Sequence, residues 1–137
     1  MRRFSVTTIF WALVGVFVVI IADMMLVPLF PTALWRVYII PLMFISWVAF
    51  FSLGLALIVL IVKKKAEGPQ GRLKKFLLLT GASAVGFLPF VILHNVVSGL
   101  FGVEEPFFFI LAVFGSPLGF LVGAIGTIVL LKKGKRQ

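Results

Sequence analysis

Four long apolar segments dominate this chain of 137 residues. They cover about residues 4–27, 37–62, 76–93 and 106–131. At about 1.5 Å rise per residue, each is long enough as a helix to cross or nearly cross a hydrocarbon core about 30 Å thick. Because lipid offers the backbone no hydrogen-bond partners, the N–H and C=O groups must be paired within each segment, which favours helices. The sequence therefore predicts an all-α integral membrane protein with four transmembrane helices.

The connections between these segments are short, which favours antiparallel neighbours in an up-down bundle. Hydrophobic residues make up 62% of the chain, compared with about 45–50% in soluble domains. Little polar sequence remains outside the connections, so an additional soluble domain has no room. We expect residues 1–137 to form a single four-span membrane domain.

The basic residues are divided unevenly between the two sides of the membrane. Of the thirteen, only Arg36 lies between the first and second segments. The other twelve flank the same ends of the segments: Arg2, Arg3, Lys63, Lys64, Lys65, Arg72, Lys74, Lys75, Lys132, Lys133, Lys135 and Arg136. Because short loops rich in Lys and Arg stay in the cytoplasm, both termini and the middle loop are expected there. The expected location is the plasma membrane of a bacterium or archaeon.

The formal net charge of +9 would suggest nucleic-acid binding in a soluble protein. Here the same residues are explained by membrane orientation and by attraction to anionic headgroups, at about 1 kcal/mol each. We therefore expect the cytoplasmic surface of the bilayer as a partner, together with another membrane protein or further copies of this chain, and no nucleic acid.

The fourth segment carries a row of small residues at every fourth position. Gly115, Gly119 and Gly123 form the row, and Thr127 continues it. Small residues spaced in this way let two helices approach closely, so the row predicts a helix-packing face. Its partner is expected to be the face of the third segment with Ala82 and Gly86, or a helix of another chain.

Three further positions shape expectations about the third and fourth segments. Phe120 lies about 100° round the helix from Gly119, so a leucine there should be far milder than at Gly119 if Phe120 faces lipid or a looser contact. Pro89 and Pro117 lie within the segments, where each removes a backbone donor and clashes with the carbonyl four residues earlier. Kinks are therefore expected at both prolines.

Polar side chains gather at the outer boundary of the four segments. They are Asp23, Arg36, His94, Asn95, Glu104 and Glu105. The first interpretation is a boundary layer, in which Asp23 pairs with Arg36 and the two glutamates meet water near the start of the fourth helix. Two alternatives stay open: a Zn²⁺ or Mn²⁺ site built from His94 with the carboxylates, and a proton-coupled site that uses Asp23 or His94.

No motif names a reaction. The chain has no Cys, no Gly-rich phosphate loop, no GxSxG and no HExxH, and its single His excludes bis-His haem ligation. We expect no enzyme activity, cofactor or resident metal. The predicted function is a non-catalytic one, as an accessory or assembly subunit or a homo-oligomeric membrane component. The alternative is a small oligomeric transporter or channel whose mouth is the outer polar cluster.

The orientation can be tested with single cysteines, because the chain has none of its own. Thr32→Cys and Gly102→Cys should react with a membrane-impermeant thiol reagent in intact cells. Gln70→Cys should react only after lysis, because its loop is expected in the cytoplasm. Equal labelling of all three variants in intact cells would contradict the assignment.

Overall fold

The computed structural model describes residues 5–26, 35–63, 71–102, 104 and 106–134, and for Trp35 and Arg36 the backbone alone. Every regular element in these ranges is helical. The elements are α1 (Val6–Leu26), the π-helical turn η2 (Trp35–Ile39), α3 (Ile40–Lys63), α4 (Gly71–Phe101), α5 (Pro106–Ile110), the π-helical turn η3 (Leu111–Gly115) and α6 (Ser116–Gly134). Four helical stretches are long and apolar enough to span a membrane: Val6–Leu26, Val37–Lys63, Gly71–Phe101 and Pro106–Gly134. The prediction of an all-helical membrane protein is confirmed to this extent.

The third helix is longer than the sequence indicated. Instead of residues 76–93, α4 covers Gly71–Phe101, 31 residues or about 46 Å. Arg72, Lys74 and Lys75 therefore belong to its first turns, and His94 and Asn95 lie within it. It ends at Gly102, whose φ of 62° suits glycine and whose N–H donates to the Ser98 carbonyl (3.0 Å), a common helix-ending geometry. A cysteine at Gly102 would be strained, so the exposed Glu104 is the better labelling position.

Two prolines are each preceded by a π-helical turn. The turn η2 ends two residues before Pro41, and η3 ends two residues before Pro117. Because a proline leaves the carbonyl four residues earlier without its usual donor, the wider π turn accommodates the ring and redirects the neighbouring hydrogen bonds. In η3 the Leu111 carbonyl accepts both the backbone N–H and the hydroxyl of Ser116 (3.2 Å for the hydroxyl). In contrast, α4 remains α-helical across Pro89.

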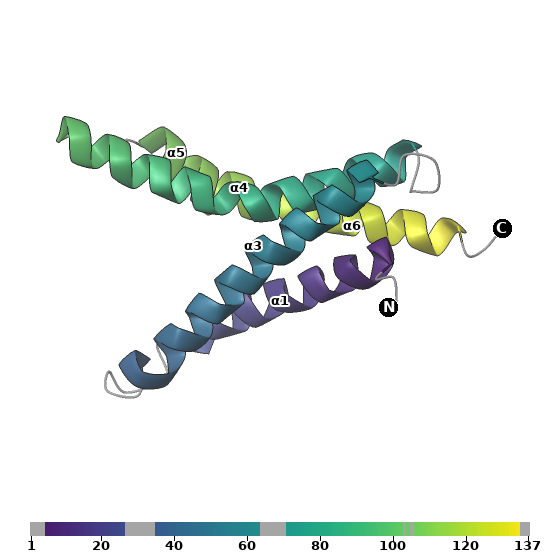
Figure 1. The fold of residues 1–137 in the computed structure, drawn as a ribbon, viewed down its shortest axis with the longest axis horizontal. Helices are drawn as coiled ribbons and strands as arrows, with labels where there is room; N and C mark the ends of the chain where they lie inside the picture. Colours follow the sequence, from purple (N-terminus) through teal and green to yellow (C-terminus); the bar gives the residue numbers. More distant parts are fainter. Residues whose placement is uncertain (1–4, 27–34, 64–70, 103, 105, 135–137) are drawn as a thin grey trace.

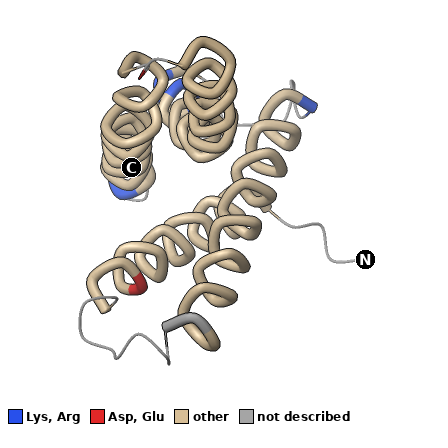
Figure 2. Tube along the Cα trace, turned by 90° about the vertical axis from the view of Figure 1, so that its left-hand side faces the viewer, with Lys and Arg blue, Asp and Glu red and all other residues tan. Residues whose placement is uncertain are grey.

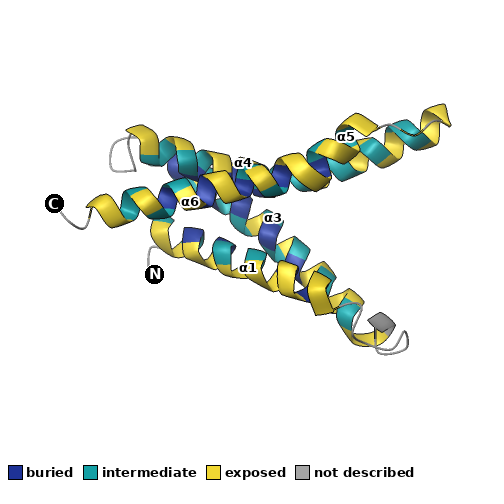
Figure 3. Cartoon of the chain, turned by 180° about the vertical axis from the view of Figure 1, so that it is seen from behind, coloured by how far each residue is buried: buried dark blue, intermediate teal, exposed yellow. Residues whose placement is uncertain are grey.

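The helices form two pairs that diverge toward one end of the molecule, with α1 beside α3 and α4 beside α6 (Figure 1). The pairs meet where α3 crosses α4, and Figure 3 shows the buried residues concentrated along these contacts. We call the end where the pairs separate the splayed end; it holds the end of α1 and α5. We call the opposite end the basic end, because Lys63, Arg72 and Lys132 lie near the helix termini there.

The crossing of α3 and α4 depends on two glycines that sequence reasoning missed. A β-carbon added at Gly54 would lie 2.8 Å from the Ala84 Cβ and 3.2 Å from the Gly81 carbonyl oxygen. One added at Gly81 would lie 2.8 Å from Ile58 Cγ1 and 3.2 Å from the Gly54 carbonyl oxygen. The two backbones therefore nearly touch, and neither position has room for a larger residue.

Two members of the glycine row, Gly119 and Gly123, face α4 of the same chain. A β-carbon added at Gly123 would lie 2.5 Å from Thr80 Oγ1 and 2.7 Å from the Thr80 backbone nitrogen. One added at Gly119 would lie 2.5 Å from the Ser83 hydroxyl oxygen. Thr127 is fully buried, and its hydroxyl makes no hydrogen bond within the described residues.

Other details of the expected packing face need correction. Gly115 is exposed, and an added β-carbon there would meet only atoms of its own helical stretch. Ala82 is exposed, and Gly86 meets only Phe90 of α4. The face of α4 that receives α6 instead carries Phe76, Thr80 and Ser83, which share one side of the helix at i, i+4 and i+7 spacing. Ala82, about 200° round the helix from Thr80, lines a separate hollow of about 240 Å³ with Ser83, Gly115 and Ser116.

Phe120 faces neither lipid nor a loose contact, so the condition for a mild substitution there is not met. It is 1% exposed and stacks on Phe17 of α1, with ring centroids 4.4 Å apart. Phe50 of α3 completes the cluster at 5.1 Å from Phe120. Nearby, Trp47 of α3 stacks on Phe87 of α4 at 4.2 Å. Aromatic residues therefore join α1, α3 and α6 where the two helix pairs begin to separate.

The three glycines of the row should respond differently to the same substitution. Gly123→Ala places a methyl group against backbone atoms, and such overpacking typically costs about 1–3 kcal/mol of unfolding free energy. Gly119→Ala should cost less, because the Ser83 hydroxyl can rotate away. Gly115→Ala meets no neighbouring helix, so it should be neutral or stabilise by up to about 1 kcal/mol through helix propensity. Thermal unfolding in mild detergent measures all three, and equal losses at Gly115 and Gly123 would contradict the packing.

Candidate functional site

A buried carboxylate links α1 to α3 near the splayed end. Asp23 lies three residues before the end of α1 and is only 6% exposed. Ser46, six residues into α3, is equally buried, and its hydroxyl donates to Asp23 Oδ2 at 3.3 Å. An acidic side chain within an apolar helix is expensive unless it is paired, so this contact is the strongest candidate site among the described residues.

The chemistry open to this pair is limited. A carboxylate and a hydroxyl can hold a proton or a small cation, or can simply join two helices through a hydrogen bond. The hypothesis that Asp23 pairs with Arg36 concerns a side chain outside the described residues. The structure places the hydroxyl of Ser46, from the second apolar segment, beside Asp23, and no pattern in the sequence indicated this partner.

Two of the other outer polar residues, His94 and Asn95, belong to α4 in the opposite helix pair. His94 belongs to α4, and its ring centroid is 5.4 Å from that of Phe109 in α5. The Asn95 amide donates to the Val91 carbonyl of its own helix at 2.8 Å. Glu104 is exposed, and Glu105 lies outside the described residues.

The expected cluster is therefore divided. The end of α1 and the end of α4 belong to different helix pairs, and Figure 2 shows the acidic positions of the described chain well separated. Among the residues that the structure describes, no three His, Asp or Glu side chains lie together in a way that could hold a metal ion.

Among the apolar hollows between the described helices, two have similar volumes. One, of about 480 Å³, is the groove between the diverging parts of α3 and α4 and is lined by Phe44, Trp47, Val48, Phe87, Leu88 and Val91. The other, of about 470 Å³, lies at the basic end between α1, α4 and α6. No sequence signal indicates either hollow, because each depends on the angle between helices and not on the residues of one helix.

Comparison with protein-family models, with curated proteins and with solved structures finds no match to this chain.

The contribution of the Asp23–Ser46 hydrogen bond can be measured. Ser46→Ala removes the donor and leaves the carboxyl buried. Hydrogen bonds between membrane helices contribute about 0.6 kcal/mol on average and about 1.7 kcal/mol at most. The substitution should therefore lower the unfolding free energy by an amount in that range. Ser52→Ala, on an exposed position of α3, should leave the thermal unfolding temperature unchanged. An equal effect of the two substitutions would show that the contact contributes nothing.

Proposed function

We propose that this chain is a non-catalytic membrane component that works by associating with further copies of itself through the groove between α3 and α4. The observation that carries the proposal is the divergence of the two helix pairs (Figure 1). Toward the splayed end, α3 and α4 separate and leave an apolar groove of about 480 Å³ along their line of divergence. Without a strong hydrophobic force between helices in lipid, close packing decides association, and an open groove offers contact area to a second copy.

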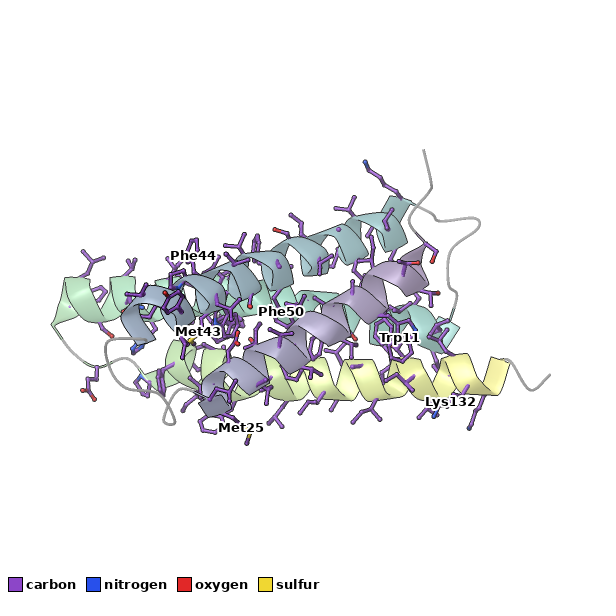
Figure 4. All side chains as sticks on the ribbon, turned by 90° about the horizontal axis from the view of Figure 1, so that it is seen from below. Trp11, Met25, Met43, Phe44, Phe50 and Lys132 are labelled. Atoms are coloured by element: carbon purple, nitrogen blue, oxygen red, sulfur yellow. The ribbon has the colours of Figure 1, made fainter. Side chains whose placement is uncertain are left out.

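The face around this groove has the features of a self-complementary contact. Phe44, labelled in Figure 4, lies at its rim and is 69% exposed. The same face therefore presents both a projecting aromatic ring and an apolar hollow. In a two-fold arrangement each copy would offer its ring to the hollow of the other, as an isologous interface requires. An accessory role toward a different membrane protein is the competing outcome.

The proposal includes the membrane arrangement expected from the sequence. The four spans would cross in alternating directions, with both termini and the α3–α4 connection in the cytoplasm. The division of basic residues supports this orientation, and the antiparallel contacts Asp23–Ser46, Gly54–Gly81 and Gly123–Thr80 are compatible with it. A plasma membrane with anionic headgroups on the cytoplasmic side suits the basic end.

A second function is favoured by one specific observation. Asp23 is a buried acidic residue within a spanning segment, and such residues commonly mark ion or proton pathways. In a small oligomeric transporter or channel, the Asp23–Ser46 pair would be the coupling site. The support for this function is weaker because the polar residues are divided between the two helix pairs, so His94 and Glu104 would have to act separately from Asp23.

Cysteine crosslinking in native membranes distinguishes these functions. Val48→Cys and Leu88→Cys each put one thiol on the groove, and both positions are about half exposed. We expect a short bismaleimide to convert each variant into a species of twice the monomer mass. Ile125→Cys, on an exposed position of α6 away from the groove, is the matched control and should remain monomeric.

The outcomes have distinct meanings. Monomer at all three positions, or the same dimer yield at Ile125 as at Val48, would overturn self-association through this groove. Adducts of Val48→Cys with another protein only would also overturn it and would favour the accessory role. Proton- or cation-driven flux in proteoliposomes that Asp23→Asn abolishes would favour the transporter function.

A further inference from the structure

A second hollow lies at the basic end, enclosed by the start of α1, the start of α4 and the end of α6. Its volume is about 470 Å³, and the side chains that define it are Thr7, Trp11, Leu73, Ile128, Leu131 and Lys132. Figure 4 shows Trp11 on α1 and Lys132 on α6 at the same end of the molecule. The hollow thus joins three helices that the chain brings together from its two ends and its middle.

The chemistry of this hollow is graded from apolar to charged. Leu73, Ile128 and Leu131 form an apolar body. Trp11, 49% exposed, has the ring type that favours the headgroup level of a bilayer. The Thr7 hydroxyl and the Lys132 ammonium supply a hydrogen-bonding group and a positive charge. An apolar chain attached to a negatively charged polar group matches this gradient.

The surrounding charge has one sign. The described residues at this end include Lys63 at the end of α3, Arg72, Lys74 and Lys75 in the first turns of α4, and Lys132 and Lys133 at the end of α6. The described acidic residues, Asp23 and Glu104, lie at the splayed end. Each Lys or Arg near a membrane surface adds about 1 kcal/mol of attraction for anionic lipid. The hollow therefore lies where the protein selects negative charge most strongly.

We infer that this hollow is a binding site for an anionic phospholipid. One acyl chain lies between α1, α4 and α6, and the phosphate group meets Lys132 and the Thr7 hydroxyl. A single phosphodiester headgroup is sufficient for these two contacts. The site requires only that the chain lies in a membrane, so it stands or falls separately from self-association through the α3–α4 groove.

Trp11 provides a local probe for the lipid in this site. The double variant Trp35→Phe, Trp47→Phe leaves Trp11 as the sole tryptophan. Reconstituted into phosphatidylcholine bilayers with a minor fraction of phosphatidylglycerol, it is compared in two preparations. In the first preparation the phosphatidylglycerol carries bromine on its acyl chains. In the second, an equal fraction of the phosphatidylcholine carries the bromine, and quenching of Trp11 fluorescence is measured in both. We expect at least about fivefold greater occupancy by the brominated anionic lipid, since about 1 kcal/mol from one lysine corresponds to that ratio.

Two lysine variants separate a defined site from diffuse attraction. Lys132→Gln should remove most of the preference, whereas Lys133→Gln, with the same change in net charge, should retain most of it. Equal loss in the two variants would reduce the effect to general surface charge and overturn the site. In the Trp11-only protein with both lysines intact, equal quenching by the two brominated lipids, or no quenching by either, would by itself overturn the proposed site. Helix content and elution volume identify a variant that has failed to fold.

Discussion

Contact between helix backbones at small residues holds this structure together. In lipid, apolar side chains gain little by leaving one apolar environment for another, so van der Waals packing at close range decides which helices associate. Helix α4 is the common partner: α3 approaches it at Gly81, and α6 approaches it at Thr80 and Ser83. These two contacts lie on different sides of α4, within one or two turns of each other. The angles at which α3 and α6 cross α4 therefore determine how the two helix pairs are arranged.

The sequence predicted the spans well because their signal is local. Length and apolar composition alone separate a membrane helix from a loop, and the four segments appear in the structure with changed ends. The ends moved because helix α4 continues through residues that look like connections, including His94 and Asn95. The Asn95 side-chain amide donates a hydrogen bond to the Val91 carbonyl of the same helix, so this polar residue does not end the helix.

Packing was harder to predict because it depends on helix rotation. The repeat of glycine every fourth residue drew attention to Gly119 and Gly123, but nothing in the sequence indicated which side of the third helix they meet. Gly54 and Gly81 were missed because each is an isolated glycine with no such repeat in its segment. The surroundings of Phe120 could not be predicted, because an aromatic residue in an apolar helix gives no sign of which neighbour it faces. The Asp23–Ser46 contact was missed for a related reason: a serine in an apolar segment acquires a role only once a second helix is placed beside it.

The distribution of prolines gives the molecule different properties at its two ends. Pro41 lies near the start of the span Val37–Lys63, Pro117 lies near the start of α6, and each is preceded by a π turn. A π turn widens the helix and displaces its side chains from the regular spacing that close packing needs. Gly115 belongs to such a turn, which explains why a β-carbon at this first member of the glycine row would not contact α4, whereas one at Gly119 or Gly123 would. Tight contact between α6 and α4 therefore begins only after Pro117, toward the basic end. The groove between α3 and α4 lies on the splayed side of the Gly54–Gly81 contact.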